Sequence, residues 1–211
     1  MRATTHDWRE RTLRRFIQLQ LGLCLFGLGI TLMLGANIGL DPWSAFHQGL
    51  STHSGLTFGR VTQLIGLALI VISYMAFRER PGLGTVFNMG VIGPWVDLFR
   101  DQPWCPEATD WLVGTAQFLG GMVLMGFAVG LYIAAQLGAG PRDGFVLGMA
   151  RRSGKSVRFV RVAMEAIVLV GGWVLGAPIG AGTVIFALGM GPLMQTFLRV
   201  FGMLKPPDPE R

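Results

Sequence analysis

Long apolar runs alternate with short polar segments along the chain. Four runs contain no Asp, Glu, Lys or Arg, at 16–40, 61–77, 111–140 and 180–198. About 20 apolar residues suffice for a helix to cross the hydrocarbon core of a bilayer. The pattern therefore predicts an all-α, polytopic transmembrane helical bundle.

Composition excludes the other broad classes. Of the 211 residues, 51% are hydrophobic and 14% are charged, whereas a soluble domain has about 25% charged residues. A soluble globular protein, a disordered chain and a secreted disulfide scaffold are all excluded. The net charge of +6 fits the basic cytoplasmic loops of a membrane protein, so we expect no nucleic-acid partner.

The sequence repeats itself. Thirteen residues of the segment 22–71 meet the same residue type 99 positions later, and seven residues of 82–99 meet it 98 positions later. Each half runs in the same order: an apolar run, Gly-x-x-Pro, Ser-Gly, a second apolar run, Gly-x-Gly-Thr-Val and Gly-Pro. We infer an internal duplication, with one repeat at 16–100 and the other at 111–202.

Each repeat contains three expected spans and one short helix. The six spans are 16–37, 58–77, 85–99, 111–137, 157–176 and 183–200. Two shorter segments, 42–51 and 141–150, each begin with a proline, which is well placed at the first position of a helix. They are too short to span, and whether they are interfacial or re-entrant stays open.

Basic residues fix the expected orientation. With six spans, a cytoplasmic basic N-terminus (1–15) and a cytoplasmic tail (203–211), only Arg60 and Arg100 of the 18 Lys and Arg residues lie outside. The positive-inside rule predicts such a bias. Because three spans per repeat is an odd number, the two repeats have opposite orientations, as in many secondary transporters.

Several motifs resemble one family. They are Leu-Gly-Ala-Gly-Pro-Arg-Asp-Gly at 137–144, Asn-Ile-Gly-Leu-Asp-Pro-Trp-Ser at 37–44, Gly-Leu-Gly-Thr-Val-Phe-Asn at 82–88, and Arg161-x-x-x-Glu165. Over about 14–201 the chain is similar to the YczE/YyaS/YitT group of bacterial integral membrane proteins. The resemblance implies a multi-pass protein of the bacterial cytoplasmic (inner) membrane and leaves its biochemical activity open.

Glu165 is the first candidate for a substrate or ion pathway. It lies about nine residues into the fifth span, near the bilayer midplane at a rise of about 1.5 Å per residue. An ionisable residue at that depth is costly and marks a functional site by default. The alternative is a structural ion pair with Arg161, one turn earlier.

The proline motifs supply further candidates. In the second repeat, Pro141 starts a helix and places Arg142 at its positive end, which suits an anion, although Asp143 could occupy the same groups. The equivalent segment of the first repeat has Asp41, Pro42 and Trp43. The alternative is a capped interfacial helix with Trp43 as an anchor.

Glycine-flanked threonines open the third span of each repeat. Thr85, with Asn88 one turn later, and Thr183 follow Gly-x-Gly. Short glycine-interrupted segments at corresponding positions point to a transporter site, but small residues also favour close helix packing.

Together these features predict a small secondary transporter whose substrate, anionic or zwitterionic, passes between the repeats. The rival is a non-transporting accessory or assembly protein that binds a partner in the bilayer. We expect no enzyme, cofactor or metal site, because no nucleophile–base pair, nucleotide motif or metal-ligand spacing is evident. The substrate, the coupling ion and the oligomeric state, a homodimer included, stay open.

Overall fold

A computed structural model describes residues 5–105, 107–138 and 140–203. Residues 1–4 of the expected N-terminal segment and 204–211 of the expected tail lie outside them. Within the described residues the chain is all-helical and has no strand, as predicted. The helices are α1 (Thr5–Gly35), α2 (Pro42–Ser54), α3 (Phe58–Phe77), α4 (Leu83–Arg100), α5 (Trp111–Ala134), α6 (Pro141–Ser153), α7 (Val157–Val174) and α8 (Ala181–Val200).

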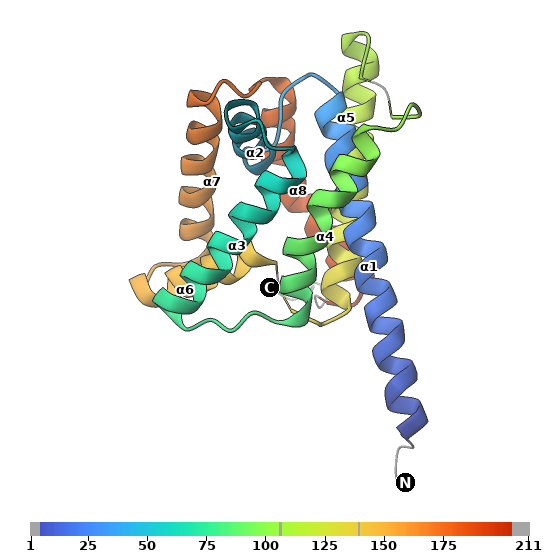
Figure 1. Ribbon diagram of the computed structural model, residues 1–211, viewed down its shortest axis with the longest axis vertical. Coiled ribbons are helices and arrows are strands. Elements are labelled where there is room, and N and C mark those ends of the chain that lie inside the picture. Colours follow the sequence, from blue (N-terminus) through green and yellow to red (C-terminus); the bar gives the residue numbers. More distant parts are fainter. Residues whose placement is uncertain (1–4, 106, 139, 204–211) are drawn as a thin grey trace, which may run out of the picture.

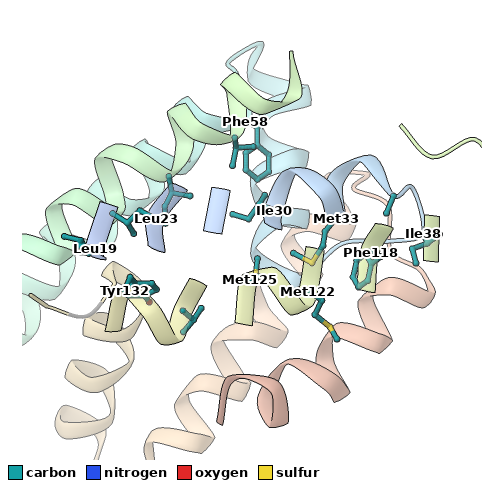
Figure 2. Close-up of a cluster of buried hydrophobic side chains, with 14 of the residues drawn as sticks. Leu19, Leu23, Ile30, Met33, Ile38, Phe58, Phe118, Met122, Met125 and Tyr132 are labelled. Atoms are coloured by element: carbon teal, nitrogen blue, oxygen red, sulfur yellow. The ribbon is translucent and has the colours of Figure 1, made fainter. Parts of the chain in front are cut away.

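Helices α1 and α5, which open the two repeats, pack along each other and carry the core (Figure 1). Glycines allow this close approach: a Cβ on Gly29 would lie 2.9 Å from the Gly121 carbonyl oxygen, and one on Gly121 would lie 2.8 Å from the Gly29 oxygen. Figure 2 shows the buried side chains around this contact, among them Leu23 and Met33 from α1 and Phe118 from α5. Helices α4 and α8 pack directly on this central pair, and α2, α3, α6 and α7 pack mainly on one another and on α4.

The remaining packing is largely reciprocal between the repeats. Helix α4 packs on α1, and its equivalent α8 packs on α5. Helix α2 packs on α7 of the other repeat, and its equivalent α6 packs on α3. The short helix of each repeat therefore lies against the second long helix of the other repeat.

Backbone details repeat as well. Equivalent residues 99 positions apart share left-handed or related conformations, with φ of 54° at Asn37 and 56° at Gln136, and 116° at Gly39 and 129° at Gly138. Two hydrogen bonds cross between the repeats in the same way, each joining a glycine amide to a carbonyl of the other repeat. They are Gly84 N to Leu137 O (2.7 Å) and Gly182 N to Ile38 O (2.8 Å). The duplication seen in the sequence is thus matched by the local structure.

Four helices are long and apolar enough to cross a membrane: α1 from Arg11, α3, α5 and α8. Helices α4 and α7 are not among the four. Helix α7 carries Arg158, Arg161 and Glu165, and α4 carries Asp97 and Arg100. Large apolar side chains are exposed on the outer surface; Met75 is 76% exposed and Leu188 is 74% exposed. An apolar exterior of this kind suits a lipid environment.

Candidate functional site

A cavity of about 990 Å³ lies where the starts of α2 and α6 meet α3, α5, α7 and α8. The predicted site residues that line it are Asp41, Pro42, Trp43, Asn88, Pro141, Arg142, Asp143, Arg161 and Glu165. They come from both repeats, so the fold gathers most of the predicted residues around one space.

Asp41 caps the N-terminus of α2. Its Oδ1 accepts hydrogen bonds from the backbone N–H groups of Trp43 and Ser44, both at 3.2 Å, as expected of an aspartate in this position. Its Oδ2 is buried and has no hydrogen-bond partner within the described residues. An unsatisfied buried carboxylate oxygen is costly, so Asp41 offers a free acceptor at the cavity.

His47, one helical turn beyond Trp43 on α2, offers a second acceptor. Thr62 Oγ1 donates to the Phe58 carbonyl at 2.9 Å and lies 3.1 Å from His47 Nδ1. Burial and, to a smaller extent, the charge of Arg142 lower the pKa of His47 well below its ordinary value, so the imidazole is neutral at pH 7. Because the Thr62 hydrogen is already donated, we assign the ring hydrogen to Nδ1. His47 Nε2, buried and unpartnered within the described chain, is then an acceptor.

Arg142 lies at the start of α6, the helix equivalent to α2 in the other repeat. Its Cζ is 4.4 Å from the centroid of the Trp43 ring, a cation–π distance. Trp43 and Arg142 are repeat-equivalent residues 99 positions apart, so this contact joins the two repeats at their equivalent points. Gly140, the N-cap of α6, has no side chain to cap the helix. The first amides of α6 and the guanidinium therefore present positive charge to the cavity.

Arg161 forms its ion pair with Asp143 of α6. Within the described residues no ion pair joins Arg161 to Glu165, so the structural pair considered from the sequence spacing is not formed. The carboxylate of Asp143 pairs with Arg161, and in the described residues it forms no ion pair with Arg142. Glu165 lines the cavity within electrostatic range of both arginines.

Thr85 and Thr183 lie away from the lining of the cavity in the part of the chain that the structure describes. Thr183 Oγ1 donates to the Leu40 carbonyl at 2.7 Å, and Thr85 Oγ1 accepts from Gly82 N at 3.2 Å. Both are buried. They hold the start of α8 and α4, and their place in a substrate pathway stays a prediction.

Sequence reasoning missed four polar lining residues: His47, Thr62, Tyr132 and Gln136. The sequence gives little signal for His47, because its difference from the repeat equivalent Val146 is shared by neighbouring pairs such as Gln48 and Leu147. Tyr132 lies in an apolar run, where it is typical of core packing. Only the packing of α5 brings it to the cavity.

A double-mutant cycle tests the pairing of Arg161. We expect Asp143→Asn and Arg161→Gln to be coupled by roughly 1 kcal/mol, since the pair is only partly buried. The matched cycle of Glu165→Gln with Arg161→Gln should show a smaller coupling, because those two residues form no ion pair. Unfolding of the purified variants in detergent measures both. Stronger coupling in the second cycle would contradict the assigned partner.

Comparison with known proteins places the chain in a family. Residues 13–199 match the family of unknown function DUF6198. The chain is 35% identical over 175 residues to the "Uncharacterized membrane protein YczE" of Bacillus subtilis, covering 82% of this chain and 80% of that protein. It is 33% identical over 187 residues to an uncharacterized Haemophilus influenzae protein (88% and 84% covered) and 27% identical over 190 residues to B. subtilis YyaS (88% and 93% covered). No solved structure matches the chain significantly.

Proposed function

This chain is a membrane protein that belongs to the DUF6198 family, and from that premise we propose that it is a small secondary transporter. In this proposal six helices span the membrane as two inverted three-helix repeats. The substrate is a zwitterion that binds in the cavity between them. The protein lies in the bacterial cytoplasmic membrane with both termini in the cytoplasm.

The reciprocal packing supports the inverted repeats. Each repeat supplies equivalent contacts to the other, from the short helices to the crossed hydrogen bonds of Gly84 and Gly182. Helices α4 and α7 have 18 residues each, a length of about 27 Å at 1.5 Å per residue. That is close to the hydrocarbon thickness of about 30 Å, so both are long enough to complete three spans in each repeat.

The polar groups of the cavity support a zwitterionic substrate. Asp41 Oδ2 and His47 Nε2 are buried acceptors that have no partner among the residues that the structure describes, a state that a purely structural interior avoids. A ligand ammonium group supplies the missing donors. The uncapped start of α6 and Arg142 supply the complementary site for a carboxylate. A zwitterion satisfies both ends, which a simple anion does not.

Broken helices at the midplane are the usual construction of a transporter site. Here α2 and α6 are short helices whose N-termini point to the same cavity from the two repeats. Because the proposed repeats are inverted, α2 can open toward the outside and α6 toward the cytoplasm as the repeats rock against each other. The Trp43–Arg142 contact lies between them.

Uptake into proteoliposomes tests the proposal. We expect at least one member of a panel of radiolabelled amino acids and betaines to accumulate under an imposed proton or sodium gradient. Arg142→Ala should reduce uptake about ten- to a hundredfold, the effect of losing a charge-assisted hydrogen bond. The control is Arg152→Ala, an exposed arginine at the other end of the same helix. Absence of uptake of every zwitterion, or equal uptake by Arg142→Ala and the parent, would contradict the proposal.

A further inference from the structure

One pair of equivalent helices breaks the reciprocal packing. Helix α3 packs closely on α4, whereas α7 and α8 make almost no contact with each other. The first pair meets through glycines: a Cβ on Gly59 would lie 2.4 Å from the Gly93 carbonyl oxygen. A Cβ on Gly66 would lie 2.8 Å from Met89 Cγ. These two helices are therefore in backbone-to-backbone contact.

The sequence of the second repeat removes that contact. The residues equivalent to Gly59 and Gly66 are Arg158 and Glu165, and Ala187 replaces Met89. A Cβ on Gly191, equivalent to Gly93, would have no atom of the described residues within 4 Å. Two charged side chains thus replace the glycines that let α3 approach α4, and α7 stands apart from α8.

The space between α7 and α8 connects the cavity to the outer surface. Eight of the described residues both line the cavity and are exposed. Four of them lie in the α5–α6 loop (Gln136, Gly138), on α6 (Leu147) and at the start of α7 (Val157). The other four are Val162 and Ala166 on α7 and Ala187 and Gly191 on α8, which we call the lateral portal. These residues lie near the middle of two helices that span in the proposed arrangement. The portal therefore faces the hydrocarbon region of the bilayer and not water.

The lining divides into a polar end and an apolar body. Polar groups gather at the starts of α2 and α6, and α7 adds Arg161 and Glu165 beside them. The rest of the α7 and α8 lining is apolar and includes Met164, Leu169, Phe186, Met190 and Met194. Methionine side chains adapt to flexible apolar partners. A volume of about 990 Å³ is at the upper end of the range for a drug-sized ligand, about 300–1,000 Å³. A small amino acid would leave most of the apolar body empty.

We propose that the ligand of this cavity is a zwitterionic amphiphile with a single aliphatic chain that enters from the lipid through the lateral portal. Its head group lies at Asp41, His47 and Arg142, and its chain lies along Met190 and Met194. The head-group position rests on the proposed function. The chain and the route through the portal are additional to it.

Photolabelling in nanodiscs tests this directly. The probe is N-dodecylglycine with a diazirine near the end of its chain, and peptide mass spectrometry locates the labelled residues. We expect saturable labelling of Met190 and Met194 that excess N-dodecylglycine suppresses and N-butylglycine does not. Labelling of the outer surface by probe dissolved in lipid should not be suppressed. Labelling at the two methionines that excess N-dodecylglycine leaves unchanged would overturn the proposal.

Variants of the portal separate this route from access through water. Ala187→Trp on α8 and, as a second variant, Val162→Trp on α7 should each reduce the suppressible labelling at least fivefold. Ala116→Trp is the matched control, because Ala116 is an exposed alanine on α5 that does not line the cavity. Full labelling in both portal variants, given unchanged elution on size exclusion, would overturn the route. Efficient disulfide formation between two Ala187→Cys copies would also overturn it, since a second copy would then cover the portal.

The outcome is independent of transport. Uptake of short zwitterions, together with no suppressible labelling by the long-chain probe, would overturn this inference and leave the proposed function intact. Suppressible, portal-dependent labelling without any uptake would support the amphiphile site and contradict the transporter.

Discussion

Gly39→Ala is expected to remove most of the folded protein. Gly39 has φ of 116°, and a Cβ there would lie 2.6 Å from the backbone N of Gly180 and 2.9 Å from Thr183 Oγ1. The strained backbone and the overlap each cost about 1–3 kcal/mol. A loss of roughly 4 kcal/mol is a large part of the stability of a typical domain, about 5–15 kcal/mol. Fluorescence-detected size exclusion and thermal unfolding in detergent measure the effect.

Gly55→Ala is the matched control. Gly55 also has positive φ, 70°, but a Cβ there would have no atom of the described part of the chain within 4 Å. Only the backbone strain applies, about 1–2 kcal/mol. We expect Gly55→Ala to fold with a modestly lowered melting temperature. Equal stability of Gly39→Ala and the parent would contradict the close contact between the repeats at this point.

The helices were predictable from the sequence because glycine and proline mark their ends. Pro42 and Pro141 start α2 and α6 where the repeat places them. Both helices continue slightly beyond the predicted 51 and 150, since Gly55 and Gly154, with φ of 70° and 66°, provide the left-handed caps that end them. Short-range signals of this kind are contained within a few residues of the chain.

The partners of the charged residues were not predictable in the same way. Spacing along one helix suggested Arg161 with Glu165, but the long Arg161 side chain reaches Asp143 on α6, which is 18 residues away in sequence. The contact of Arg142 with Trp43 joins residues 99 positions apart. Such contacts depend on how the repeats pack, and an amphipathic pattern contains no information on that packing.

The separation of α7 from α8 was predictable only in part. The sequence contains its cause, since Arg158 and Glu165 stand where the first repeat has Gly59 and Gly66. Comparison of the repeats shows Glu165 as a charge present in one half only. What it does not show is that the two glycines are in contact with α4. The consequence for helix packing becomes visible only in the structure.

The orientation of the two repeats is the central claim of this account, and cysteine labelling tests it most directly. Ser54 and Ser153 are equivalent, exposed residues at the ends of α2 and α6. Each is replaced singly by cysteine in a protein in which Cys24 and Cys105 are serine. Intact cells are then treated with a membrane-impermeant maleimide, before and after permeabilisation.

In inverted repeats, equivalent positions lie on opposite sides of the membrane. The account predicts that Ser54→Cys is labelled in intact cells and that Ser153→Cys is labelled only after permeabilisation. Labelling of both cysteines from the same side would contradict it, because the repeats would then be parallel and each would cross the membrane an even number of times.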